Sequence, residues 1–323
     1  MQSSELLVQV DPGIVPEDLA DFASAVDASF FQSPDWLRLV AGVEGRYRPW
    51  VPCVRDAAQR LLAALPLFEV RQWGTRRLYG GPWGTYGGIV SHDETATQAL
   101  AAWFQQQAGS FALVRLHDFS DSFVSPGNSW NRQLESTQIV ELPHDPQRLF
   151  EGTFTSQNRN KIRKAEKNDV TVACYDDATA LQVYAELYAR LASRLEVADP
   201  LSRGLFAGLA ACPGVQVWLA HRQGQVIAGL LNFRWGGQIM NWGNVSSPES
   251  WKYAPNNLLH WKALQHACLD VDGPRLYNFG SSAVSEKVHT FKKSFGAVDR
   301  SYARHERTSG WLSWLQRLRG GTS

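Results

Sequence analysis

Cationic side chains are concentrated in two short stretches of this sequence. The segment 156–167, SQNRNKIRKAEK, sets its basic residues against one acid, Glu166, and the stretch 291–293 reads Phe-Lys-Lys. Guanidinium and ammonium groups can bind phosphates or stabilise a developing oxyanion. The first stretch is therefore a candidate polyanion patch, and a solvated helical face is the alternative. Its basic residues are Arg159, Lys161, Arg163, Lys164 and Lys167.

Carboxylate and imidazole groups offer fewer arrangements with a chemical use. Asp118 follows His117 at the end of an apolar run, where it could hold or deprotonate an amine if it faces a cleft. The alternative is an aspartate satisfied by its own loop. His260 and His266 are six residues apart and miss the i, i+4 spacing of helical metal ligands. No Ser-His-Asp or Cys-His set can be assembled by spacing, so neither a covalent nucleophile nor a metal is expected.

Composition narrows the class of protein. The chain has 323 residues, 44% hydrophobic and 20% charged, with a formal net charge of +1. This is a globular composition without the global basic field that holds DNA. Four cysteines without a CxxC pair, no signal-peptide pattern and no apolar run of membrane-spanning length predict a cytoplasmic protein. Contact with a membrane is expected only transiently and at its surface.

The first half mixes helix and strand signals. Ser33 and Pro34 open a helix, and Asp93 or Glu94 opens another over 94–108. Strands are predicted over 47–55, 60–70, 111–118 and 137–142. Pro143 and Pro146 then break the chain, so we place the first domain at 1–145.

A glycine-rich segment, YGGPWGTYGG at 79–88, interrupts this first half. It matches no phosphate-loop spacing, because no GK[ST] follows and GxGxxG is absent. It is interpreted as a tight turn between strands. The alternative is a substrate-lining loop in which Trp83 and Tyr86 face a cleft.

The second half has a clearer element order. A basic helix over 156–167 and a strand over 169–174 precede helices over 178–196 and 202–211. Three strands joined by short glycine-containing turns follow, and then a helix, a strand, a helix and a strand. The later elements are predicted at 215–222, 225–235, 238–245, 256–270, 274–280, 285–294 and 298–305. From 169 onwards this order resembles that of the GNAT acyltransferase fold.

Two further stretches sharpen the resemblance. They are RNKIRKAEKNDVTV at 159–172, and PNNLLHWKALQHA with LYNFGSSAVSEKVHTFKKSFG within 255–296. With SPDWLRLV and the YGG loop, they resemble the Fem family of peptidoglycan interpeptide-bridge enzymes, over nearly the whole chain. The resemblance implies an α/β fold of two GNAT-like domains, each a mixed sheet flanked by helices. The second domain is expected at 146–305.

The resemblance also implies a reaction, the transfer of an aminoacyl group from a charged tRNA to an amine of a peptidoglycan precursor without a bound cofactor. It assigns the family's FK lysine to Lys292, which would place positive charge near the acyl carbonyl. It assigns a contact with the precursor's phosphates to Arg194. In the family a lysine at the end of the tryptophan-containing helix makes another such contact; Val40 stands at that place here, so the contact is assigned less directly to the nearby Arg38. The basic helix then becomes the tRNA patch, and Asp118 a second catalytic candidate. A helix over 306–323, with an apolar stripe, would return to the first domain.

Two other functions remain open. One is acyl-CoA-dependent N-acylation of a sugar or polysaccharide intermediate, and the other is a non-catalytic binding module. Acyl-CoA enzymes of this fold carry a glycine-rich run before the helix that cradles pyrophosphate, and segment 242–257 lacks it. Asn244 and Ser246 in that segment are expected to contact the acyl or acceptor group.

Overall fold

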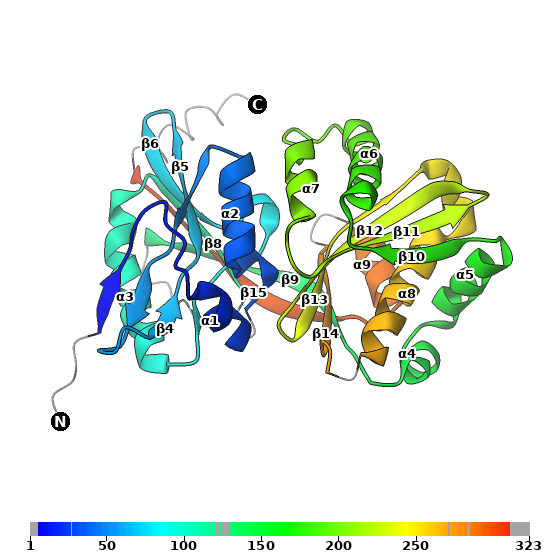
Figure 1. Ribbon diagram of the computed structural model, residues 1–323, viewed down its shortest axis with the longest axis horizontal. Coiled ribbons are helices and arrows are strands. Elements are labelled where there is room, and N and C mark those ends of the chain that lie inside the picture. Colours follow the sequence, from blue (N-terminus) through cyan, green and yellow to red (C-terminus); the bar gives the residue numbers. More distant parts are fainter. Residues whose placement is uncertain are drawn as a thin grey trace. The chain divides into compact units, whose positions relative to one another are not determined.

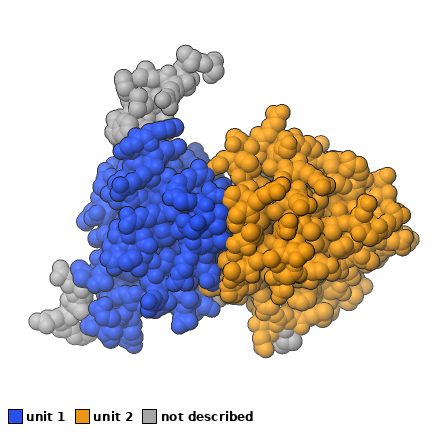
Figure 2. All heavy atoms as spheres, turned by 45° about the horizontal axis from the view of Figure 1, so that its top comes forward, with its two compact units in different colours: residues 1–135, 301–323 blue, residues 136–300 orange. Residues whose placement is uncertain are grey.

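The computed structural model describes residues 6–26, 28–119, 123, 129–270, 272–282 and 285–310. The chain forms two compact units, residues 1–135 with 301–323 and residues 136–300 (Figure 2). It leaves the first unit within β9 (Asn131–Glu141) and returns within β15 (Val298–Thr308). The first boundary was predicted after residue 145, beyond the end of β9.

The first unit has a four-stranded sheet of order β1-β3-β4-β7 and strands in the order β15-β8-β6-β5-β2. Helix α3 packs against strands β1, β3, β4 and β7 (Figure 1). The helices are α1 (Leu19–Ala25), α2 (Pro34–Val43) and α3 (Glu94–Gln107). The strands are β1 (Leu7–Gln9), β2 (Tyr47–Trp50), β3 (Cys53–Arg55), β4 (Leu61–Ala64), β5 (Leu67–Gln72), β6 (Thr75–Gly80), β7 (Val90–Ser91) and β8 (Leu113–Asp118).

Prolines explain the main error of the prediction for this unit. The single strands predicted over 47–55 and 60–70 are each two strands, broken at Pro52 and Pro66. A proline cannot donate a hydrogen bond to a sheet ladder, so the pairing ends there. The outer pieces β2 and β5 pair with each other, whereas β3 and β4 pair in the four-stranded sheet.

The glycine-rich segment forms the predicted tight turn. Thr85 N–H donates to the Pro82 carbonyl at 3.2 Å. A Cβ on Gly81 would lie 1.9 Å from the Thr85 carbonyl oxygen, so the turn requires glycine at this position. Trp83 inside the turn has φ 56°, a left-handed conformation.

The second unit is one mixed sheet of order β10-β11-β12-β13-β14-β9, antiparallel except between β13 and β14. The predicted hairpin meander is confirmed. The strands are β10 (Thr171–Tyr175), β11 (Val215–Arg222), β12 (Gln225–Trp235), β13 (Gln238–Ser246) and β14 (Leu276–Ser281). The helices are α4 (Pro146–Gly152), α5 (Ser156–Lys167), α6 (Ala178–Arg194), α7 (Arg203–Leu209), α8 (Pro255–Leu269) and α9 (Glu286–Lys293).

Helices cover this sheet in layers. Helix α6 packs on β11, β12 and β13, and α8 also packs on the sheet, with α4 and α5 beyond it (Figure 1). Because α8 lies between two layers, it is apolar around most of its circumference. Tyr184 of α6 fits against the sheet because Gly229 and Gly243 leave room. A Cβ on Gly243 would lie 2.6 Å from the Tyr184 hydroxyl.

Strand β15 corrects the predicted start of the C-terminal helix. Residues 306–308 are the last residues of the strand and pair with β8. The apolar stripe of that predicted helix lies outside the described residues. In the described part of the chain, no helix is long and apolar enough to cross a membrane.

Candidate active site

The two parallel strands of the second unit separate at their carboxyl ends. Pairing between β13 and β14 covers Gln238–Met240 and Leu276–Asn278, and both strands continue beyond it. On β14 the next residues include Gly280, whose φ of +76° turns the backbone. Residues on the diverging ends therefore line a gap in the ladder, a common place for ligands in α/β sheets.

Lys292 of α9 is fixed to one of these diverging ends. Its side chain is 7% exposed, and Nζ donates to the carbonyls of Gly280 and Ser281, both at 2.8 Å. Burial lowers the Lys292 pKa to about 8. An ammonium group has three N–H bonds, so one remains for a substrate oxygen. The neighbouring Lys293 is more exposed and pairs with Asp299 at 3.1 Å.

A β-bulge determines which side chains of β13 face α8. Leu231 pairs with Gly243 but Asn232 pairs with Asn241, so Trp242 is the extra residue. The bulge puts Asn241 and Asn244 on the same face, although their spacing in a regular strand would separate them. Asn244 Nδ2 lies 2.7 Å from His260 Nε2 of α8.

Ser246 lies two residues beyond Asn244 and ties the connection between β13 and α8 together. Its Oγ accepts from Trp251 Nε1 at 3.0 Å and from Asn256 Nδ2 at 3.2 Å. Both predicted residues of this segment thus contact the first half of α8.

His260, whose spacing from His266 argues against a metal site, is a residue of this region for which the sequence predicts no other role. It is fully buried, and Nδ1 lies 3.1 Å from the Tyr277 hydroxyl. Burial, and then the charge of Lys292, lower the His260 pKa to about 3. Its signal in the sequence was only a histidine within an otherwise apolar helix, which usually marks core packing.

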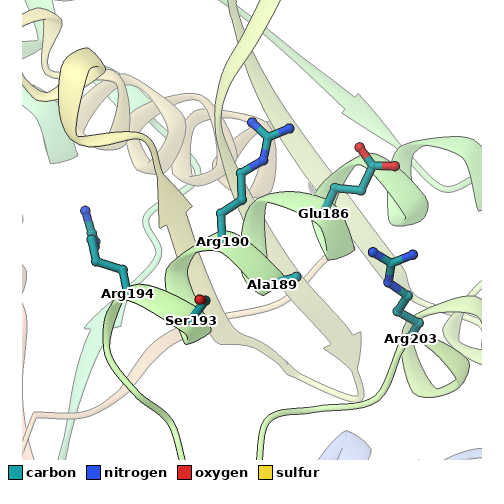
Figure 3. A pocket seen from close by; sticks show the side chains of 6 residues that line it. All are labelled: Glu186, Ala189, Arg190, Ser193, Arg194 and Arg203. Carbon is teal, nitrogen blue, oxygen red and sulfur yellow. The ribbon is translucent and has the colours of Figure 1, made fainter.

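Arg194 lies at the end of α6 beside a surface pocket of about 620 Å³. Figure 3 shows Arg190 and Glu186 on α6 and Arg203 at the start of α7 around the same pocket. The Arg194 guanidinium carbon lies 5.2 Å from the centroid of Trp251. No carboxylate of the described residues lies within ion-pair distance of these three arginines, so they can accept an anion.

The five basic residues of α5 have different roles in the structure. Arg159 Nη1 donates to the carbonyls of Glu151, at 3.2 Å, and Phe154, and therefore helps to fix the end of α4. Arg163 stacks over Phe150, with its guanidinium carbon 5.6 Å from the ring centroid. The remaining members of the patch are exposed lysines at three-residue spacing on the helix, Lys161, Lys164 and Lys167.

The candidates of the first unit are mostly committed to its own structure. Asp118 is fully buried and accepts from Phe123 N–H at 2.7 Å, as expected of a loop-satisfied aspartate. Tyr86 is buried against other aromatic rings, including Tyr302 at 5.1 Å between centroids. Trp83 is partly exposed and packs on Trp36 and Tyr47.

Arg38, the other predicted phosphate contact, is exposed on α2 of the first unit. Among the described residues, no group of three or more His, Cys, Asp or Glu side chains is placed to hold a metal ion.

Comparison with known proteins agrees with this architecture. Residues 154–293 match the family model described as an acetyltransferase (GNAT) domain. The solved structure of FemX is similar over 95% of this chain and 99% of its own, with a TM-score of 0.71 and 13% identity. The structure of L-PGS from Bacillus licheniformis is similar over 93% of this chain and 95% of its own, with a TM-score of 0.56 and 13% identity.

A tandem GNAT protein from the clavulanic acid biosynthesis pathway is similar over 94% of this chain and 99% of its own, with a TM-score of 0.52 and 14% identity. None of the curated proteins matches this sequence. The predicted fold of two GNAT-like domains and the resemblance to the Fem enzymes are thus confirmed at the level of the fold. Residues 154–293 of the second unit thus match a GNAT acetyltransferase domain model, and the chain has the fold of FemX over nearly its whole length.

Proposed function

We propose that this protein transfers an aminoacyl group from a charged tRNA to an amine of a peptidoglycan precursor. The observation that carries the choice of donor is the closed connection between β13 and α8. The short helix Pro248–Tyr253 occupies it, and Ser246 accepts hydrogen bonds from Trp251 and Asn256 across it. The alternative donor, acyl-CoA, needs backbone N–H groups at this helix end to hold its pyrophosphate.

The beginning of α8 is poorly suited to an anion. Pro255 occupies the first helical position and has no N–H to donate to an anion. Glu249 adds a negative charge to the short helix just ahead. These features disfavour acyl-CoA as the donor, whereas an aminoacyl ester of tRNA does not need this pyrophosphate site.

The arginine pocket supports a phosphate-bearing acceptor. Arg190, Arg194 and Arg203 line one open pocket, and one guanidinium group can bind two phosphate oxygens at once. Glu186 at the same pocket would repel an anion that approached from its side. The exposed lysines of α5 supply the candidate surface for the phosphates of tRNA.

The chemistry requires little covalent assistance. A neutral acceptor amine attacks the ester carbonyl, the new C–N bond forms, the ester C–O bond breaks, and the tRNA 3′ oxygen leaves with a proton. Negative charge develops on the carbonyl oxygen in between. The free N–H of Lys292 is the group we assign to that oxygen. Asp118 and Arg38 in the first unit stay predictions for the acceptor.

The decisive experiment offers donors separately. The purified full chain is incubated with a UDP-linked muramoyl pentapeptide and either a pool of charged tRNAs or a pool of acyl-CoA thioesters, and products are identified by mass. We expect aminoacyl adducts with charged tRNA alone. Products formed only from acyl-CoA would replace this proposal by the N-acyltransferase function. Absence of product from both pools would contradict catalysis on this acceptor.

A further inference from the structure

A chain of buried polar side chains runs between the sheet of the second unit and α8. Asn241 Nδ2 lies 3.2 Å from Asn232 Oδ1, which also accepts from the Tyr277 hydroxyl at 3.2 Å. The same hydroxyl lies 3.1 Å from His260 Nδ1, and Nε2 of that ring lies 2.7 Å from Asn244 Nδ2. Such a network is costly to bury unless every member is oriented to satisfy the next.

One backbone carbonyl fixes which groups donate and which accept along this hydrogen-bond network. The Leu231 carbonyl can only accept, and Asn241 Nδ2 donates to it at 3.1 Å. The same amino group therefore meets Asn232 through its oxygen, Oδ1. The Tyr277 hydroxyl must then donate its hydrogen to that oxygen, which leaves the hydroxyl oxygen as an acceptor.

The His260 imidazole extends this order of donors and acceptors to Asn244. Nδ1–H of His260 donates to the Tyr277 oxygen, and a neutral imidazole then has a lone pair at Nε2. Asn244 must donate its Nδ2–H to this lone pair. Its own oxygen consequently points away from His260, as an acceptor whose orientation is set by a carbonyl in the adjacent strand.

Two amide oxygens at this place have no partner. Asn244 Oδ1 and Asn256 Oδ1 are both buried without a hydrogen bond, while each amino group is used, toward His260 and Ser246. The two asparagines take part in neighbouring contacts between β13 and α8, Asn244 with His260 and Asn256 with Ser246. Asn244 and Ser246 are two residues apart on the strand, and Asn256 and His260 are four apart on the helix, so each pair shares one face of its element. An unpaired buried acceptor costs about 1–3 kcal/mol, so a donor is expected here.

We propose that Asn244 and Asn256 form a subsite for a primary amine, held by N–H donation to their two amide oxygens. Resting on the proposed function, this subsite would take either the α-amine of the transferred aminoacyl group or the amine of the acceptor. Amide oxygens reject phosphates and carboxylates, which are also acceptors. Being neutral, they hold an amine without the ion pair by which a carboxylate would favour its charged form, and an attacking amine must be neutral.

The order of donors and acceptors along this hydrogen-bond network can be tested without any substrate. In protein labelled with ¹⁵N-histidine, the two ring nitrogens of His260 are assigned by their absence in His260→Gln. We expect one neutral tautomer, with the proton on Nδ1, between about pH 5 and 9. A proton on Nε2 would reverse the chain and overturn the subsite. Tyr277→Phe removes the oxygen that accepts from Nδ1, and should allow the second tautomer to appear.

The ligand class is tested by titration of ¹⁵N-asparagine-labelled protein. Three probes are used, L-alanine methyl ester for the donor amine, Nα-acetyl-L-lysine methyl ester for the acceptor amine, and N-acetyl-L-alanine methyl ester, which has none. One amine probe should shift the Asn244 and Asn256 side-chain signals saturably, and which one does identifies the source. Equal shifts with the acetylated probe, or none with either amine, would overturn the proposal.

Substitution links the signals to the subsite. Asn244→Leu should weaken binding of the amine probe by about tenfold, measured from the Asn256 side-chain signal. Asn131→Leu makes the same change at an exposed position of β9 and should leave the affinity unchanged. These outcomes are separate from those of the donor experiment. Saturable amine binding without transfer from charged tRNA would refute the proposed function but support the amine subsite. Transfer from charged tRNA without amine binding would support the function and refute the subsite.

Discussion

Lys292 gives a prediction that needs no knowledge of the substrate. Burial lowers the pKa of its ammonium group from about 10.5 to about 8, so the folded protein releases this proton more easily than the unfolded chain does. Between these two values the unfolded state binds more protons, and the free energy of unfolding therefore rises with pH. A separation of this size is worth about 3 kcal/mol when the whole window is crossed.

Lys292→Met keeps most of the side-chain volume and removes the titrating group. We expect the free energy of unfolding of the wild type, relative to that of this variant, to rise by about 2 kcal/mol between about pH 7.5 and 9.5. Urea unfolding at several pH values measures this difference. Lys293→Met is the matched control, because it removes a charge from the same helix while Lys292 remains, and it should keep the wild-type rise. A constant difference between wild type and Lys292→Met would show that the ammonium group is not buried as described.

Three further predictions concern the second unit. Arg203→Ala should raise KM for a phosphate-bearing acceptor by about tenfold with kcat nearly unchanged, and an equal loss in kcat would mean that the pocket does not bind the ground state. Replacing Lys161, Lys164 and Lys167 by glutamine should flatten the salt dependence of tRNA binding by a slope of about 2–3, and an unchanged slope in filter binding would remove α5 from that surface. Gly243→Ala should lower stability by about 1–3 kcal/mol, because its Cβ would meet the Tyr184 hydroxyl at 2.6 Å; an unchanged melting temperature would refute this packing.

The sequence predicts the second unit better than the first. Capping residues and glycine-containing turns such as Gln223-Gly224 act locally, so strands β11 to β13 are predicted almost to the residue. In the first unit, Pro52 and Pro66 separate strands that an apolar run had joined. Which sheet each piece enters depends on distant partners, and no local signal carries that information.

The candidate site shows the same division. Lys292 stands out by its motif, but its two carbonyl partners belong to a strand that ends eleven residues earlier. Asn244 is singled out by its place before α8, whereas His260 and Tyr277 have the character of core residues. The bulge at Trp242 decides that Asn244 faces His260, and a bulge of this kind has no reliable pattern in a single sequence.

The placement of β15 has a consequence for the order in which the chain is completed during synthesis. Residues 136–300 are continuous, so the second unit has all of its residues before the last strand of the first has been translated. Until Ala303–Thr308 emerge, Leu113–Asp118 of β8 wait almost two hundred residues for their antiparallel partner. The nascent first unit therefore exposes a free sheet edge throughout that interval, the kind of surface on which chaperones and aggregation compete.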